Sequence, residues 1–311
     1  MPKVSVIIPN FNHERFLTQR IESVLNQTFQ DFELIILDDC STDNSRSIIE
    51  KFRNHKKVSK IFYNSVNSGS TFRQWEKGIA LAAGELIWIA ESDDYASPEF
   101  LDTLIRPFLN YPEVAISFCR SVNVDENNNI IGLTLHADKL DPVKWTHDYI
   151  EDGRVEISKY LKFRNTIPNA SAVLFKNPNN LNAVLSTDMR FTGDWLFWKN
   201  ILKENNNKIA YSQNPLNFFR EHSNTTRSIK KSINIDSELK RFREYKTFIP
   251  NSLFTAFDGR FRWMMAEWID RGVCTALRKT HYRYLPELHP ALIIRYYVYL
   301  IRRFLKKRYF N

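Results

Sequence analysis

Apolar runs and amphipathic stretches alternate along the first 124 residues. The runs are short and end at proline, glycine or acidic residues, which predicts buried strands. The stretches between them carry apolar residues at helical spacing, which predicts helices that cover a sheet. We expect strands at 4–9, 33–39, 60–63, 85–90 and 114–124, and helices at 14–27, 43–52, 71–83 and from 97 onward. This βαβ order predicts an α/β fold with a mostly parallel, Rossmann-like sheet flanked by helices.

The pattern is less regular beyond residue 124. Residues 125–160 are polar and rich in Asn and Asp, and we expect loops there. Strands are predicted at 171–175 and 208–219, with a helix that begins near Asp194. Aromatic and basic residues recur over 236–268, which favours helices with a packed aromatic face. The sequence therefore predicts a compact α/β body at 1–230 and a helical extension at 231–311.

The net charge of the chain is concentrated at its C-terminal end. The sequence has 44 Lys and Arg against 35 Asp and Glu, a net charge of +9. Residues 271–311 contain ten basic side chains and one acidic side chain, so this segment accounts for +9 and residues 1–270 sum to zero. A neutral body argues against a nucleic-acid-binding groove through the fold, and we expect no nucleic-acid partner.

Composition and motifs exclude other classes. At 43% hydrophobic and 25% charged residues, the chain is globular rather than disordered. Cys40, Cys119 and Cys274 form no CxxC pair, which argues against a disulfide scaffold and favours a reducing compartment. Without GxGxxG or GxxxxGK[ST], a classical dinucleotide fold and a P-loop NTPase are unsupported. No apolar run reaches the ~20 residues that span a bilayer, and the N-terminal run is too short for a signal peptide.

Acidic and small polar residues follow three of the predicted strands. The first strand ends in Pro-Asn-Phe-Asn at 9–12, the second in Asp-Asp at 38–39, and the fourth in Glu-Ser-Asp-Asp at 91–94. In a parallel sheet these ends lie along one edge, where ligands bind. Phe11 can stack on a flat ring, Asp39 can accept hydrogen bonds from a base or ribose, and the acidic run suits Mg²⁺ or Mn²⁺ bound with phosphate. Helix capping and solvation are the alternative role for such acids.

Several motifs in this region resemble glycosyltransferase family 2. They are the stretch 4–52 with its Leu-Asp-Asp-Cys-Ser-Thr-Asp segment, Asn-Ser-Gly at 67–69, Gly-Ile-Ala-Leu-Ala-Ala-Gly-Glu at 78–85, and Ala-Glu-Ser-Asp-Asp at 90–94. The resemblance is dense over residues 3–124 and weaker to about residue 228. It implies a GT-A fold, a nucleotide-diphospho-sugar donor, a divalent metal ion and inversion at the anomeric carbon.

The resemblance assigns roles to five residues of the first half. Pro9, Phe11 and Asp39 match positions that hold the nucleoside, with Asp39 facing the base. Asp93 matches the metal-binding Asp of the family's DxD motif, and Glu91 stands where the first Asp of that motif usually is. The resemblance therefore implies that Asp93 is the main protein ligand of Mn²⁺ or Mg²⁺ and that Glu91 is a second candidate.

Other positions depart from the family pattern. The family's Ala-Arg-Asn helix motif is replaced by Phe-Arg-Gln-Trp at 72–75, and Arg73 is expected either to reach the diphosphate or to be a solvated helix residue. Ser92, inside the acidic run, is assigned to nucleotide binding. Cys40 replaces a common glycine, and we interpret it as a small buried residue rather than a reactive thiol.

The second half is expected to supply the base and to complete the metal site. Asp194 resembles the Asp of the family's Glu-Asp motif, the general base of an inverting transfer, and Gly193 replaces the acid before it. His222 resembles the C-terminal histidine that completes the metal or diphosphate site, although a lone histidine is more often structural. Arg220 and Arg227 are candidates for diphosphate contacts because guanidinium pairs with phosphate in a forked geometry.

The last stretch, 291–310, combines an apolar stripe, several tyrosines and clustered cations. This pattern is typical of a helix that lies in a membrane interface. We therefore expect an enzyme of the cytoplasm that associates peripherally with the anionic inner face of a membrane. An ordinary packed C-terminal helix is the alternative.

The sequence predicts an inverting, non-processive glycosyltransferase. It would move a sugar from a nucleotide-diphospho-sugar to a glycan or lipid-linked acceptor in surface polysaccharide assembly. Three alternatives stay open at this point: a nucleotide-sugar-binding module without catalysis, a nucleotidyltransferase, and nucleic-acid binding through the basic tail. The predicted subdivision places nucleotide binding in residues 1–124 and acceptor binding in 125–230.

Overall fold

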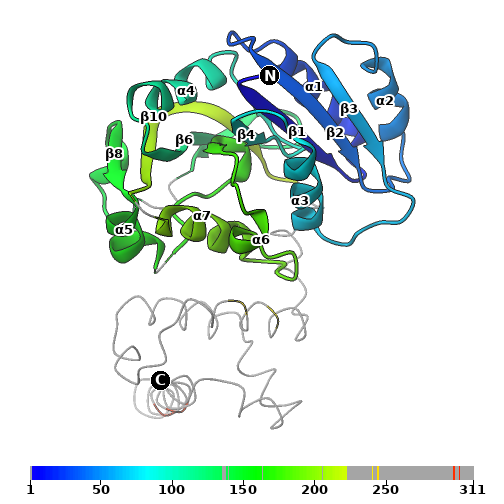
Figure 1. Cartoon of the computed structure of the whole chain (residues 1–311). Coiled ribbons are helices and arrows are strands. Elements are labelled where there is room, and N and C mark those ends of the chain that lie inside the picture. The colour runs from blue at the N-terminus through cyan, green and yellow to red at the C-terminus, as the bar shows by residue number, and fades with distance from the viewer. Residues whose placement is uncertain are drawn as a thin grey trace. The chain divides into compact units, whose positions relative to one another are not determined.

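The computed structural model describes residues 2–134, 138, 140–162, 164–204, 206–222, 240, 244, 297 and 301. The chain divides into two compact units, residues 1–225 and 226–311. Every helix and strand reported below belongs to the first unit (Figure 1). Arg227 and, apart from the four single positions, the segments 236–268 and 291–310 lie outside the described residues. Within the described part of the chain, no helix is both long and apolar enough to cross a membrane.

A mixed sheet forms the centre of the first unit. Its N-terminal part is wholly parallel and runs in the order β3-β2-β1-β4. The strands are β1 (Val4–Asn10), β2 (Phe32–Asp38), β3 (Val58–Tyr63) and β4 (Leu86–Ile89). β1 pairs with both β2 and β4, so the carboxyl ends of these three strands lie next to one another.

The other part of the sheet is mostly antiparallel. β9 lies between β4 and β6 and runs antiparallel to both, whereas the long β10 runs parallel to β6. Three short strands, β5, β7 and β8, pair antiparallel with β10, β6 and β10. The bounds are β5 (Tyr95–Ala96), β6 (Val114–Val124), β7 (Ile130–Leu133), β8 (Tyr149–Asp152), β9 (Val173–Lys176) and β10 (Lys208–Arg220).

Helices cover both faces of the sheet. Side chains of β1, β2 and β4 form one buried core with α1 (Glu14–Leu25), α2 (Ser45–Lys51) and α4 (Phe100–Asn110). The other face packs against α3 (Thr71–Leu81) and α7 (Gly193–Lys203). Gly78 permits α3 to lie close to the sheet, since a Cβ there would be 2.4 Å from Ile7. Four-residue helices follow β8 and β9, namely α5 (Gly153–Glu156) and α6 (Leu181–Val184).

The predicted α/β fold is confirmed, with three changes of detail. The parallel arrangement is confined to β3-β2-β1-β4 and to the β6–β10 pair, because β9 enters the sheet in the opposite direction. The fourth helix begins at Phe100 rather than at Pro98. The prediction of loops over 125–160 is only partly right: this segment also contains β7, β8 and α5, whose short lengths left no periodic signal.

A buried ion pair lies in the second half of the unit. The Nζ of Lys144 lies 2.7 Å from a carboxylate oxygen of the fully buried Glu156. The same ammonium group lies 4.3 Å from the ring centroids of Tyr149 and Tyr160, a cation–π arrangement. Thr166 also donates a hydrogen bond to Glu156. This cluster contains charged groups, whereas the core of the first half is apolar.

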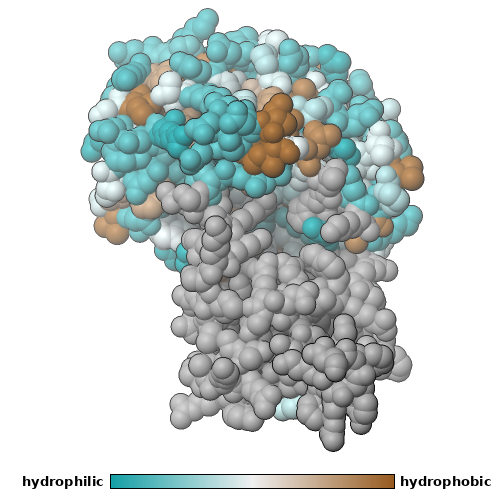
Figure 2. Space-filling view, turned by 180° about the vertical axis from the view of Figure 1, so that it is seen from behind, coloured by the Kyte–Doolittle hydropathy of each residue, from teal (hydrophilic) through white to brown (hydrophobic). Residues whose placement is uncertain are grey.

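The outer surface of the first unit is mostly hydrophilic. Figure 2, seen from the side opposite to Figure 1, shows small brown patches on a mainly teal surface. The most exposed apolar side chains of the described residues include Val66, Ile130 and Leu109, which belong to separate loops, strands and helices.

Candidate functional site

The predicted convergence of strand ends is present in the structure. Asn10, the last residue of β1, is in register with Asp38 at the end of β2, and its carbonyl accepts a 2.8 Å hydrogen bond from the Asp39 N–H. On the other side of β1, Ile7 is in register with Ile89 of β4. Polar residues that follow β1, β2 and β4 therefore share one edge of the sheet.

Asp39 lies in a dense hydrogen-bond network next to this edge. Its Oδ1 accepts hydrogen bonds from Asn64, from the Ser68 backbone and from Gln74, at 2.6, 2.8 and 2.9 Å. Within the described residues, its Oδ2 accepts one, from the Ser68 hydroxyl at 2.7 Å. Oδ2 is thus the less engaged of the two carboxylate oxygens. Phe11, 44% exposed, follows β1 on the same edge.

Two other residues predicted for the nucleotide lie in different surroundings. Pro9 is buried within β1. Arg73 is exposed on α3, and its Nη1 donates a 3.4 Å hydrogen bond to the carbonyl of Ser68, the residue that also binds Asp39. Arg73 is therefore close to the Asp39 loop and open to solvent.

Three distant segments bring a possible metal-ligand set together. His13 lies just before α1, Asp93 follows β4, and His222 follows β10. One ligand atom from each of the three lies within 4.8 Å of the others. His222 Nε2 is 3.1 Å from Asp93 Oδ2, and the rings of His13 and His222 meet edge to face at 5.5 Å. Asp93 and His222 were both predicted for the metal, whereas His13 was not.

The three acids of the 91–94 run differ in the direction in which their pKa values are shifted. Burial alone would raise the pKa of Asp93, but the hydrogen bond with His222 and the nearby His13 imidazole hold that pKa below its usual range. Burial and the Asp93 charge raise the pKa of Glu91 to about 8 and that of Asp94 to about 6. Asp93 is thus the acid of this run whose ionised form is best stabilised.

The side chains of the adjacent residues Glu91 and Ser92 have different hydrogen-bond partners. Glu91 Oε1 accepts a 2.8 Å hydrogen bond from the indole of Trp75, and Glu91 is not in the three-residue group around Asp93. The hydroxyl of buried Ser92 lies 2.8 Å from His13 Nδ1. Ser92 therefore contacts a residue of the metal-ligand group, and a nucleotide contact of its side chain stays a prediction.

Arg220 has surroundings different from those predicted. It is 1% exposed, and its three guanidinium nitrogens donate to the carbonyls of Asp93 and Asp125 and to the side chain of Gln19. A guanidinium group so enclosed joins three segments of the chain by hydrogen bonds and is not open to a diphosphate. Asp94 is likewise internal, because it accepts hydrogen bonds from the Arg220 backbone and from Asn169.

Asp194 stands in the first turn of α7, as the sequence predicts. Its Oδ1 accepts a hydrogen bond from the Trp195 N–H at 2.7 Å, and its Oδ2 accepts one from Asn165 at 3.0 Å. The half-buried carboxylate is thereby fixed in orientation. Gly193 explains the missing acid before it: a Cβ there would be 2.5 Å from the ring of Phe72, so that ring occupies the space of a side chain.

The donor set around Asp93 fits a divalent cation of the Mn²⁺ type. Imidazole nitrogen and carboxylate oxygen are both accepted by Mn²⁺. A ligating histidine usually uses its second nitrogen for a hydrogen bond that fixes the ring, and the contact of His13 Nδ1 with Ser92 leaves Nε2 available. Mg²⁺, which prefers oxygen ligands, fits two histidines less well.

His13 was missed because it is a single histidine without a motif. A signal was nevertheless present, since His13 is the N-cap residue of α1 and caps no backbone N–H with its side chain. Ser, Thr, Asp and Asn are the residues that favour this position. A poor capping residue in the short connection between a strand and a helix on the ligand edge is therefore a reason to suspect a binding role.

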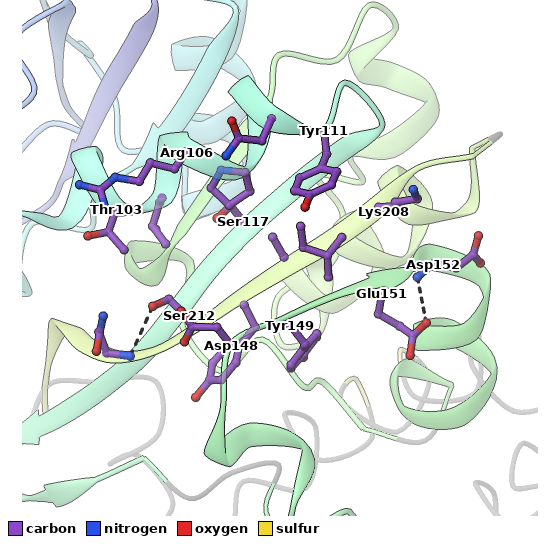
Figure 3. Close-up of a pocket in the computed structure, with 17 residues that line it drawn as sticks. Thr103, Arg106, Tyr111, Ser117, Asp148, Tyr149, Glu151, Asp152, Lys208 and Ser212 are labelled. Carbon is purple, nitrogen blue, oxygen red and sulfur yellow. Dashed lines mark hydrogen bonds between the residues drawn. The ribbon is translucent and has the colours of Figure 1, made fainter.

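A separate cavity of about 700 Å³ lies between α4, β8 and β10. Arg106 and Tyr111 on one side face Ser212 and Lys208 of β10 on the other (Figure 3). None of the residues predicted for the donor, metal or base lines it.

Comparison with known proteins decides the family. The family model of glycosyl transferase family 2 matches residues 5–168, more than half of the chain. The chain belongs to this family. An uncharacterised glycosyltransferase of Haemophilus influenzae is 29% identical over 220 residues, which are 71% of this chain and 80% of that protein. One of a Nostoc species is 33% identical over 141 residues, 45% of this chain and 38% of that protein.

A third relative has an assigned reaction and a solved structure. Poly(ribitol-phosphate) beta-N-acetylglucosaminyltransferase TarS of Staphylococcus aureus is 38% identical over 105 residues, 32% of this chain and 18% of TarS. The crystal structure of TarS 1–349 in complex with UDP-GlcNAc matches with a TM-score of 0.63 at 19% identity, over 91% of this chain and 78% of that one. These matches confirm the predicted family, its class of enzyme and the GT-A fold.

Proposed function

We propose that the protein transfers a sugar from a nucleotide-diphospho-sugar to a glycan or lipid-linked acceptor, with inversion at the anomeric carbon, in surface polysaccharide assembly. The observation that carries this proposal is the meeting of His13, Asp93 and His222 at the edge of the sheet where Asp39 and Phe11 also stand. Family membership supports the class of reaction.

The nucleoside is proposed to bind between Phe11 and Asp39. Phe11 is exposed enough to stack on a base, and Asp39 Oδ2 is the less engaged oxygen of its carboxylate. An ionised carboxylate only accepts hydrogen bonds, so it can bind an N–H donor on the pairing edge of a base. Every nucleobase has such a donor, so Asp39 does not by itself select the base. TarS was solved with UDP-GlcNAc, and a UDP- or dTDP-linked sugar is the donor that we propose.

The metal ion is proposed to be Mn²⁺, held by His13, Asp93 and His222. When bound, such an ion neutralises the charge of the leaving nucleoside diphosphate. We assign Glu91 a supporting role because its carboxylate is hydrogen-bonded to Trp75. Arg73, exposed beside the Asp39 loop, is the described arginine that we propose for the diphosphate in place of the enclosed Arg220.

Asp194 is proposed as the general base. The acceptor oxygen attacks the anomeric carbon while the bond to the diphosphate breaks on the opposite side, and the acceptor proton passes to the carboxylate of Asp194. Its hydrogen bonds from Trp195 and Asn165 fix the carboxylate for this transfer. Docking of residues 291–310 on an anionic membrane remains our proposal for how a lipid-linked acceptor is presented.

A donor screen tests this function. The protein is incubated with Mn²⁺ and a panel of nucleotide sugars, and released UDP, dTDP and GDP are measured. We expect one UDP- or dTDP-sugar to be turned over by the native protein and not by the Asp93→Ala variant. Turnover that survives Asp93→Ala would show that the metal assignment is wrong. Pyrophosphate release from a nucleoside triphosphate would instead identify a nucleotidyltransferase.

A further inference from the structure

Helix α1 has an arginine on its buried face. The buried positions of this helix are Phe16, Leu17, Arg20, Ile21 and Val24, and Arg20 is 0% exposed. Burying a cationic side chain is costly, so a buried arginine needs compensation. Burial lowers the pKa of Arg20 to about 10 although Asp94, Asp93 and Glu91 oppose this effect, so the guanidinium is charged at neutral pH.

The contacts of Arg20 all lead toward the 91–94 run. Its Nε donates a 2.8 Å hydrogen bond to the carbonyl of Glu91, and its guanidinium lies 5.3 Å from the ring centroid of Trp88 on β4. Its two terminal nitrogens have no hydrogen-bond partner in the described part of the chain. An unpaired buried donor destabilises the folded protein. The site therefore retains an arginine at a cost to stability.

Arg220 holds the same run from a second direction. Its Nε donates a 2.7 Å hydrogen bond to the carbonyl of Asp93, and its backbone N–H donates to Asp94 at 2.9 Å. A terminal nitrogen donates to Gln19, the neighbour of Arg20 on α1. The guanidinium also lies 4.5 Å from the ring centroid of Phe16 on the same helix. Two buried arginines thus bind the carbonyls of Glu91 and Asp93, two residues apart.

We propose that Arg20 and Arg220 are positioning residues that fix the backbone of residues 91–94, so that Asp93 points toward His13 and His222 before a metal ion arrives. This inference rests on the proposed metal site. It accounts for the direction of the hydrogen bonds, because both arginines bind backbone carbonyls of the run and leave the Asp93 carboxylate to His222.

Charge compensation is the competing explanation, and it predicts the opposite change in Mn²⁺ affinity when Arg20 is removed. If Arg20 served only to offset the acids, its removal would take a positive charge away from the cation site and tighten Mn²⁺ binding. If Arg20 fixes the backbone, its removal loosens the run and weakens Mn²⁺ binding. The two roles are therefore separable by measuring metal affinity without any substrate.

The experiment compares Arg20→Met and Arg20→Lys with the native protein. Free Mn²⁺ is titrated by electron paramagnetic resonance, and folding is checked by thermal unfolding. Outer partners of metal ligands typically change affinity 10- to 100-fold, and we expect a loss of about this size in both variants. Lysine keeps the charge but lacks the Nε donor and the planar group that faces Trp88. The Arg20→Lys variant should therefore not restore native Mn²⁺ affinity. Arg106→Met, on the exposed side of α4, is the control.

A milder variant covers the case in which Arg20 variants fold poorly. Gln19→Ala removes one hydrogen bond from Arg220 and leaves both buried charges in place. One hydrogen bond of about 0.5–1.5 kcal/mol corresponds to a loss of Mn²⁺ affinity of about 2- to 10-fold.

Unchanged or tighter Mn²⁺ binding by either folded Arg20 variant would overturn the positioning role. Failure of the native protein itself to bind Mn²⁺, with Asp93→Ala indistinguishable from it, would instead overturn the proposed metal site. In turnover assays, the positioning role predicts a raised KM for Mn²⁺ with kcat at saturating metal changed only a few-fold.

Discussion

The two halves of the first unit build their parts of the site by different means. In the first half, β1, β2 and β4 are adjacent parallel strands, and Phe11, Asp39 and Asp93 follow their carboxyl ends. In the second half, the strands run in both directions, and β10 has irregular register with β6. His222 and Asp194 are placed there by long-range packing rather than by a repeated unit.

Helix α3 connects the two halves through the motif that departs from the family pattern. Gln74 binds Asp39, Trp75 binds Glu91, and the ring of Phe72 fills the space beside Gly193. The ring of Trp75 also contacts Phe197 and Trp198 of α7. The comparison therefore teaches that one helix can link the regular, parallel half of the sheet to the irregular half.

The largest effect is expected for a substitution of Asp194, the general base that we propose in the second half. Asp194→Asn keeps the shape of the side chain but removes its ability to accept a proton, so kcat should fall about 10²- to 10⁴-fold with little change in the KM for the donor. Asp188→Asn, at an exposed position six residues earlier, is the matched control. Steady-state release of nucleoside diphosphate measures both, and an Asp194→Asn enzyme with native kcat would refute the base assignment.

The next prediction compares the stability lost when a buried ion pair of the second half and an exposed ion pair of the first half are broken. Lys144→Met leaves the carboxylate of Glu156 buried without its partner, and the free energy of unfolding should fall by about 3–5 kcal/mol. Arg53→Met breaks the exposed pair with Glu50 on α2 and should lower the stability far less, because surface ion pairs are screened by water. Urea denaturation checks both values.

A double variant sharpens this second prediction. Lys144→Met combined with Glu156→Leu removes both charges, so much of the lost stability should return. A double variant as unstable as Lys144→Met alone would show that the packing of these side chains matters more than their charges.

A smaller effect tests the link between α3 and α7. Gly193→Ala places a methyl group against the ring of Phe72, and overpacking of this kind costs about 1–3 kcal/mol. Phe72→Leu should make room for that methyl group, so the two changes together should cost less than their sum. Thermal unfolding of the single and double variants gives the coupling energy, and additive effects would show that the ring and the glycine are independent.

The smallest effect concerns the turn after β2. Cys40 has a φ of 62°, a left-handed conformation that favours glycine, and its side chain is half-buried rather than fully buried as predicted. Cys40→Gly relieves strain but adds freedom to the unfolded chain, so stability should change by about 0.5 kcal/mol or less. Cys40→Val should cost more than about 1 kcal/mol, because a β-branched residue resists positive φ. Equal stability of the two variants would contradict this account.

The site was predictable from sequence where strand order determines it. Asp39 and Asp93 follow apolar runs of the parallel half, and their proximity needs only the rule that parallel strand ends lie along one edge. Arg220 shows the limit of that rule. Its position at the end of β10 gave no sign that its guanidinium is enclosed by Asp93, Asp125 and Gln19. Arg20 could have been noticed, as a charge within the apolar stripe of α1.

The sequence by itself determined the family, the parallel half of the sheet and the identity of the acids on its edge, because hydrophobic periodicity and motif spacing are local properties. Tertiary structure alone decided that Glu91 binds Trp75, that His13 joins Asp93 and His222, and that Arg220 is internal. The physical reason is that side-chain direction depends on neighbours far away in the chain, and no local pattern records which polar group will be buried beside which.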